Sequence, residues 1–142
     1  ERDILLATTG VEDAEISAVF DSKGLMEAQT AVRRMPIGES IIELILDLVR
    51  SARPGDGASE LANNSVSWGP GPRAAQALSL SVRARALMDG RFAPNPEDIV
   101  ALAHPVLKHR MALGFAARAE GLTVDGLIST LVDQTLGEGA SA

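Results

Sequence analysis

The sequence predicts an all-α fold, a bundle of about four to six helices joined by short loops. Apolar residues recur at helical spacing in several segments, and stretches rich in glycine and proline separate these segments. No run of residues alternates convincingly between apolar and polar side chains, as a half-buried strand would. The chain is 46% hydrophobic but has one Trp, three Phe and no Tyr, so aliphatic side chains must build the core.

The chain is expected to begin with a short helical segment and a connector, which together occupy residues 1–20. The clearest helix covers residues 39–53, because a wide apolar stripe repeats there at helical spacing: Ile41, Ile45, Leu48 and Ala52. Further helices are expected at residues 21–34, 72–88, 95–103 and 124–136. Segments 54–68 and 114–121 are expected to be loops, and residues 137–142 a disordered tail.

The composition argues against several classes of function. The chain has no cysteine, so disulfides and thiolate metal sites are excluded. The formal net charge is −6 and the basic residues are spread along the chain, so the overall field disfavours nonspecific binding to nucleic acid or anionic lipid. No apolar stretch is long enough for a membrane span. Because the chain starts at Glu1 and directly in a helical segment, we expect it to be a piece of a longer protein.

The most distinctive stretch is a loop of two glycines and two prolines, Gly69 to Pro72, which opens the helix expected at 72–88. Pro72 suits the first helical turn, where its missing N–H costs nothing and its fixed φ is already helical. Arg73 then lies in the first turn, where the free N–H groups and the helix dipole favour an anion. A cation in this place suggests an anionic partner such as phosphate. From spacing alone, a solvated arginine beside a tight loop is the simpler interpretation.

Three stretches resemble one known family. Gly69-Pro70-Gly71-Pro72-Arg73-Ala74 is similar to the Gly-x-Ser-Pro-Arg-Ala stretch that opens a lid helix in the MoxR group of AAA+ ATPases. Residues 93–103 resemble that family's Val-Thr-Pro-Glu-Asp-Val-x-x-Leu-Ala, and residues 105–111 resemble its Pro-Val-Leu-x-His-Arg-Leu. The three stretches occur in family order. Gly71 stands where the family has serine, and the 54–68 loop is extended.

The resemblance implies that residues 1–136 form one AAA+ lid domain, in which residues 1–20 follow a missing ATPase base domain. It implies that Arg73 is the family's sensor 2 residue, reaching the phosphates of ATP on that base domain, and that Gly71 and Pro72 line the same contact. ATP and Mg²⁺ would bind the full-length protein, a cytoplasmic, chaperone-like ATPase that forms a homo-oligomeric ring, typically hexameric. A von Willebrand factor A-domain protein is the expected type of partner.

Several motifs are absent from the sequence. There is no phosphate loop, no strand ending in paired acids for Mg²⁺, and no Ser–His–Asp or His-Glu-x-x-His motif. His104 and His109 lack the spacing of two ligands on one helix face, so no metal site is expected. The chain alone should therefore not hydrolyse ATP. A basic patch of Lys108, His109 and Arg110 could touch a neighbouring subunit.

The role of Trp68 and the function of the whole chain each have an alternative interpretation. Trp68 directly precedes the central loop and is expected to bury the base of that loop, with contact to an adenine ring as the alternative. The alternative function is a non-enzymatic helical protein-interaction module, which would use its apolar faces or the 54–68 loop. A helical DNA-binding domain is disfavoured, because no helix gathers basic side chains on one face.

Overall fold

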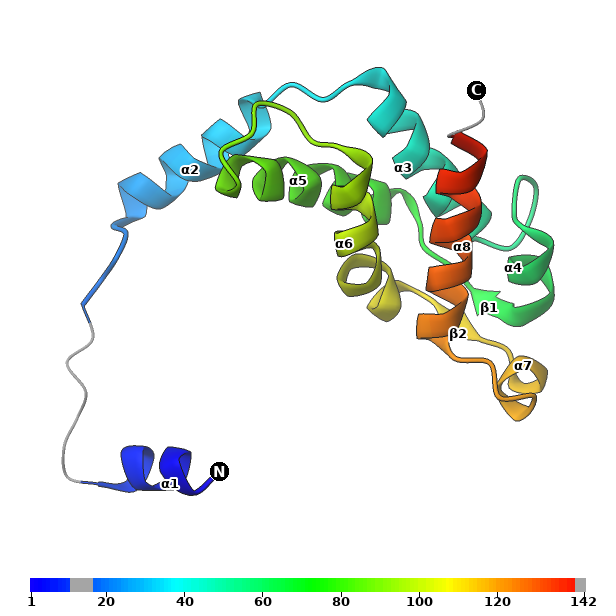
Figure 1. The fold of residues 1–142 in the computed structure, drawn as a ribbon. Coiled ribbons are helices and arrows are strands. Elements are labelled where there is room, and N and C mark those ends of the chain that lie inside the picture. Colours follow the sequence, from blue (N-terminus) through cyan, green and yellow to red (C-terminus); the bar gives the residue numbers. More distant parts are fainter. Residues whose placement is uncertain (11–16, 140–142) are drawn as a thin grey trace. The chain divides into compact units, whose positions relative to one another are not determined.

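The computed structural model describes residues 1–10 and 17–139, and within them the fold is almost entirely α-helical, as predicted (Figure 1). Eight α-helices and one 3-10 turn, η1, lie in these residues together with a two-stranded antiparallel ladder. The helices are α1 (Arg2–Thr9), α2 (Ser22–Arg34), α3 (Glu39–Ser51), α4 (Glu60–Ser65), α5 (Pro72–Met88), α6 (Pro96–Leu107), α7 (Phe115–Ala119) and α8 (Val124–Gly139). The other elements are β1 (Val66–Trp68), η1 (Lys108–Arg110) and β2 (Ala112–Leu113).

The chain divides into two compact units, residues 1–30 and 31–142. The first unit contains α1 and most of α2, and none of its described side chains is buried. The helix expected at residues 21–34 is confirmed: α2 begins at Ser22, and Asp21 Oδ1 accepts a hydrogen bond from the Gly24 N–H at 2.6 Å. Residues 11–16 of the expected connector lie outside the described residues.

The second unit holds the core, which four helices build. α5 packs against α3 and α6, and α8 packs against the same two helices (Figure 1). Each of the four contributes at least one side chain that is almost fully buried: Leu48, Leu78, Ile99 and Leu131. Burial of each such side chain stabilises the fold by about 1.5–3 kcal/mol. The core is aliphatic, as the composition predicts, and the stripe of α3 faces it as expected.

The contact of α5 with its neighbours uses small residues. The helical spacing predicts two adjacent apolar stripes along α5, one made of Ala77, Leu80, Ala84 and Leu87 and the other of Ala74, Leu78 and Val82. The structure buries the second stripe, which Ala86 extends. Leu87, on the other stripe, remains 39% exposed. Alanine at two of the four buried positions lets the backbones of α5 and α6 approach closely, so the position of α5 is tightly constrained by the core.

The prediction that residues 54–68 form a loop is wrong for their second half, which contains α4 and β1. Ser59 begins α4, because its Oγ accepts a hydrogen bond from the Ala62 N–H at 3.0 Å. β1 pairs with β2, with Val66 opposite Leu113 and a register irregularity before Trp68. A three-residue strand whose partner lies more than forty residues away leaves no local alternation, so the sequence pattern could not show it.

Two other segments expected to be irregular also contain helix. The connector 114–121 contains α7, a short helix whose Ala117 is buried. Gly121 follows it with a φ of +86°, a left-handed conformation that favours glycine. α8 runs to Gly139, three residues into the expected tail, and residues 140–142 lie outside the described residues.

Candidate anion-binding site

The loop that precedes α5 is fixed at both of its ends. β1 leads into it, and the pairing of β1 with β2 holds Trp68 opposite Ala112. At the next residue, Gly69, a Cβ atom would lie 2.6 Å from the Ala52 carbonyl oxygen and 2.7 Å from the Arg53 Cα. Only glycine fits such a close approach between two backbones. The loop is therefore held against the C-terminal end of α3.

The start of α5 is as expected from the sequence. Pro72 is the first residue of the helix, and Gly71 is the N-cap with φ −97° and ψ −172°. Gly71 has no side chain to accept a hydrogen bond from the first turn, and nothing lies within 4 Å of the position its Cβ would take. The N-terminus of α5 therefore opens toward solvent without a side-chain cap.

Arg73 lies in this first turn with an exposed side chain. Within the residues that the structure describes, no hydrogen bond or ion pair of its guanidinium is formed. Arg91, by contrast, is held by carboxylates at the other end of α5. The Arg73 side chain is therefore available to a group outside this part of the chain.

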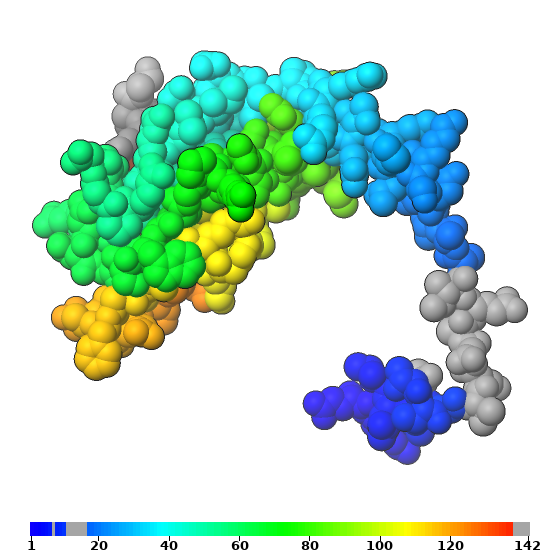
Figure 2. Space-filling model, turned by 180° about the vertical axis from the view of Figure 1, so that it is seen from behind, coloured from blue at the N-terminus to red at the C-terminus, as the bar shows by residue number. Residues whose placement is uncertain are grey.

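The loop and η1 form the two sides of an open pocket of about 570 Å³. Trp68, Gly69 and the first residues of α5, Pro72 to Ala74, line one side, and His109 and Arg110 line the other. Figure 2 shows the surface of this part of the molecule, where the green start of α5 lies beside the yellow segment that contains η1. The lining includes two arginines and a histidine but no Asp or Glu, so the pocket suits an anion.

The expected basic patch of Lys108, His109 and Arg110 is divided between two sides. Lys108 points away from the pocket and its Nζ pairs with Asp125 at 2.7 Å. Arg110 lines the pocket, and its Nη1 donates a hydrogen bond to the Val106 carbonyl oxygen at 2.7 Å and contacts His109 Nε2. Two sequence signals included Arg110, the basic patch and the resemblance of residues 105–111 to the family's Pro-Val-Leu-x-His-Arg-Leu stretch, and neither identified the pocket.

The expectation that Trp68 buries the base of the loop is wrong. The Trp68 side chain is 54% exposed and lines the pocket. The close approach of Gly69 to the end of α3 holds the loop in its place. An exposed indole at the rim gives the pocket an apolar wall beside its cationic groups.

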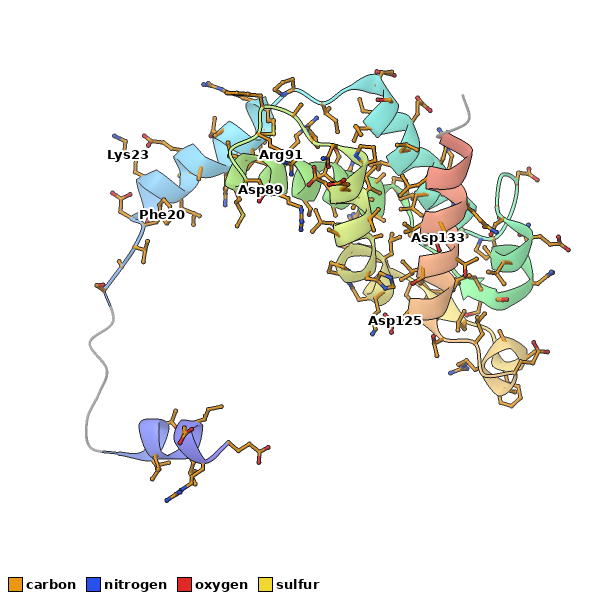
Figure 3. The ribbon with its side chains drawn as sticks, in the orientation of Figure 1. Phe20, Lys23, Asp89, Arg91, Asp125 and Asp133 are labelled. Atoms are coloured by element: carbon orange, nitrogen blue, oxygen red, sulfur yellow. The ribbon has the colours of Figure 1, made fainter. Side chains whose placement is uncertain are left out.

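At its C-terminal end, α5 is joined to α6 by an ionic cluster that the sequence did not reveal. The Asp98 side chain is 1% exposed and accepts hydrogen bonds from Arg91 Nη1 at 2.8 Å and from Nη2 at 2.6 Å. Arg85, whose side chain is 47% exposed, approaches the same carboxylate through Nε at 3.1 Å. Figure 3 shows Arg91 beside Asp89, its second partner, in the turn after α5. These contacts fix α5 at the end opposite Arg73.

The charges in this cluster stabilise one another. The hydrogen bonds from Arg91 lower the pKa of Asp98 below its ordinary value of 3.8, despite the burial of the carboxyl group. Asp98 also closes a capping box: it accepts from the Asn95 N–H at 2.9 Å, and the Asn95 side chain accepts from the Asp98 N–H. The predicted helix start at Asn95 is thus confirmed, and Asp98 additionally anchors two arginines.

A Ser–His–Asp arrangement, absent from the sequence as a motif, is formed in space. His104 Nδ1 lies 3.4 Å from Asp125 Oδ1, and Nε2 lies 3.2 Å from Ser129 Oγ. Asp125 and Ser129 are one turn apart on the exposed face of α8. The Ser129 N–H lies beyond the first turn, where it is engaged within the helix and cannot contribute to an oxyanion hole. We assign the arrangement to the packing of α6 on α8, in which Lys108 and His104 lower the pKa of Asp125.

Residues 1–10 and 17–139 contain no cluster of three or more His, Asp or Glu side chains arranged to hold a metal ion. Among the same residues, no helix has the length and hydrophobicity needed to cross a bilayer.

Residues 58–131, from the turn before α4 into α8, match the AAA lid domain family, and the chain belongs to that family. Its relatives narrow this class to the lid of a MoxR-like ATPase. "Chaperone MoxR1" of Mycobacterium tuberculosis (strain ATCC 25618 / H37Rv) is 24% identical over 136 residues, which are 93% of this chain and 35% of that protein. The match to MoxR1 confirms the family that the resemblance of the loop and of residues 93–111 indicated.

The chain is similar to two further proteins. "Uncharacterized protein YeaC" of Bacillus subtilis (strain 168) is 31% identical over 117 residues, 82% of this chain and 34% of that protein. The crystal structure of a "putative ATPase" from Cytophaga hutchinsonii ATCC 33406 superposes with a TM-score of 0.81 at 25% identity, over 92% of this chain and 40% of that one. The chain therefore spans about a third of the length of the curated relatives it matches.

Proposed function

We propose that this chain supplies the sensor 2 arginine, Arg73, to ATP bound on an ATPase base domain of the same full-length protein. The nucleotide would lie between that base domain and the pocket at the start of α5. Gly71 and Pro72 would let the phosphates approach the helix N-terminus, where the dipole and the first-turn N–H groups favour negative charge. Mg²⁺ would be held by acids of the base domain, because Mg²⁺ usually binds one or two carboxylates together with the phosphates.

The observation that carries this proposal is the placement of Arg73. It lies exposed in the first turn of a helix, beside a pocket whose lining contains cationic side chains and no carboxylate. An arginine there is unfavourable for the helix dipole unless an anion binds nearby. A guanidinium matches phosphate oxygens with two parallel hydrogen bonds, so a nucleotide satisfies the charge of the pocket.

Coupling between nucleotide state and lid movement follows from the same contact. The γ-phosphate is present in ATP and lost on hydrolysis, so an arginine that pairs with it binds the two states with different affinities. A ligand shifts a conformational equilibrium by its differential affinity for the two states. In our proposal, Arg73 stabilises the charge of the transferring phosphoryl group and releases the lid when that charge has gone.

For the full-length protein, the relatives support a wider proposal. The Mycobacterium tuberculosis relative is named as a chaperone, so we propose a chaperone-like role for the full-length protein in the maturation of protein complexes. We further propose a cytoplasmic homo-oligomeric ring and a von Willebrand factor A-domain partner, as in the MoxR group. Sedimentation of the full-length protein with and without ATP tests the ring: a monomer under both conditions would contradict it.

The direct test of the site is steady-state ATP hydrolysis by the full-length protein and by its Arg73→Ala variant, with ATP affinity measured by calorimetry. We expect turnover to fall by about tenfold or more, because a charge-assisted contact in the transition state is lost. Circular dichroism and sedimentation must show that folding and assembly are unchanged. If turnover and affinity stay at wild-type values, Arg73 is a surface residue, and the helical protein-interaction module becomes the better assignment.

A further inference from the structure

Arg73 is one of two arginines that line the pocket. Arg110, from η1, faces it from the other side, although the two residues come from distant parts of the sequence. The pairing of β1 with β2 brings these parts together, because β1 precedes the loop and β2 directly follows η1. The same short ladder therefore brings together the two backbone segments that carry these arginines.

Arg110 is the more firmly held of the two. Its Nη1 donates to the Val106 carbonyl oxygen at 2.7 Å, which satisfies an acceptor in the last turn of α6. The residues that flank η1 on both sides, Leu107 and Met111, are buried in the core. An arginine has five N–H donors, so several remain for a ligand after the contact with Val106. A side chain already fixed in this way loses little conformational freedom when it binds.

We propose that Arg110 is a second anion-binding residue of this pocket and acts with Arg73 on the phosphates of the bound nucleotide. This inference rests on the proposed function, because it places both arginines on the same ligand. Two guanidiniums without a carboxylate among the lining residues favour a ligand with several anionic oxygens over a single carboxylate. Arg110, being held by the main chain, contributes to affinity in every nucleotide state.

The variant that tests this role is Arg110→Gln in the full-length protein. Glutamine removes the charge and keeps an N–H donor, although on a shorter side chain, so the urea midpoint shows whether loss of the contact with the Val106 carbonyl oxygen destabilises the fold. Arg118→Gln is the matched control, since it makes the same change at an exposed arginine of α7 that does not line the pocket. Arg110→Lys keeps the charge and loses the planar fork.

ATP affinity is measured by calorimetry at several salt concentrations, together with the urea midpoint of each variant. We expect Arg110→Gln to weaken ATP binding about tenfold and to make the affinity less dependent on salt, because one screened charge contact is lost. Arg110→Lys should recover part of the affinity, and Arg118→Gln should behave as the wild type. A loss of affinity with an unchanged salt dependence and a lowered urea midpoint would overturn the inference in favour of a structural role.

The outcome separates this inference from the assignment of Arg73. If Arg73→Ala lowers turnover while Arg110→Gln binds ATP as the wild type does, the inference fails and the proposed function stands. If Arg110→Gln weakens ATP binding while Arg73→Ala changes nothing, Arg110 is the anion-binding residue and the sensor 2 assignment fails. If neither variant has an effect, both proposals fail.

Discussion

The close approach of Gly69 to the end of α3 gives the sharpest prediction, the effect of Gly69→Ala. The added methyl carbon would lie 2.6 Å from the Ala52 carbonyl oxygen and 2.7 Å from the Arg53 Cα. Cβ atoms in proteins essentially never approach other heavy atoms closer than 3.0 Å, and ordinary van der Waals contact begins at 3.4 Å. The loop must therefore move by about 0.4–0.8 Å. The neighbouring atoms are backbone atoms, and Ala52 is fully buried, so a side-chain rotation cannot relieve the clash.

The expected cost follows from what overpacking does in rigid surroundings. Inserting one methyl group where the surroundings must shift costs about 1–3 kcal/mol. With a urea m-value of about 2 kcal/mol/M, a loss of 2 kcal/mol lowers the unfolding midpoint by about 1 M. The assay is equilibrium urea unfolding of the 142-residue chain, followed by circular dichroism.

Gly71→Ala is the matched control, because it makes the same chemical change two residues later. Nothing lies within 4 Å of the added Cβ, and the φ of −97° suits alanine. This variant should change the free energy of unfolding by less than about 1 kcal/mol in either direction, because alanine lowers the entropy of the unfolded chain but is a poorer N-cap residue than glycine. Equal midpoints for Gly69→Ala and Gly71→Ala would refute the argument that the loop is seated by the contact at Gly69.

Three further predictions follow from the caps and the ionic cluster. Gly71→Ser should stabilise the chain by about 0.5–1 kcal/mol, since the hydroxyl can accept from the first turn of α5 and the site has room; a lower urea midpoint would contradict this. Asp98→Asn should cost about 2 kcal/mol of unfolding free energy in the same assay, and Asp133→Asn, an exposed acid without a described partner, should cost almost nothing. The cost of Asp98→Asn is limited because Arg91 and Arg85 are 31% and 47% exposed and can be rehydrated. The pKa values of Asp98 and Asp125 are lowered in the folded state, so the stabilisation that their carboxylates give to the fold is present above the ordinary pKa of 3.8 and is lost as the pH falls below it. Urea midpoints should therefore be level from pH 7 to about 5 and then decline, and the decline should be less steep in Asp98→Asn.

Helices with local signals could be predicted from the sequence. The stripe of α3, the cap at Asn95 and the proline start at Pro72 lie within a few residues of what they specify, and the structure confirms all three. The family resemblance indicated the AAA lid fold, and the family match confirms it. The position of Arg73 in the first helical turn was also a local inference.

The features that could not be predicted from the sequence depend on contacts between residues that are distant along the chain. β1 has a partner about forty-five residues away, so neither strand carries a pattern of its own. Arg110 and Trp68 reach one pocket only because that pairing exists, and their neighbours in the sequence give no sign of it. From its neighbours in the sequence, Asp98 is predicted only as an acid in the first turn of a helix. Its burial results from the packing of α5 against α6, which brings Arg91 and Arg85 to its carboxylate.

The pairing of β1 with β2 also determines when the pocket can form during synthesis. When the ribosome has made the chain only as far as the end of α6, α5 and its arginine have been synthesised, but neither η1 nor β2 exists to complete the other side of the pocket. The chain must reach Leu113 before Val66 finds its partner. A nascent lid therefore contains α3 and α5 before it can form the pocket, and it can bind an anion there only after β2 has been synthesised and has left the ribosome. Premature termination before β2 would yield helical fragments without a complete pocket.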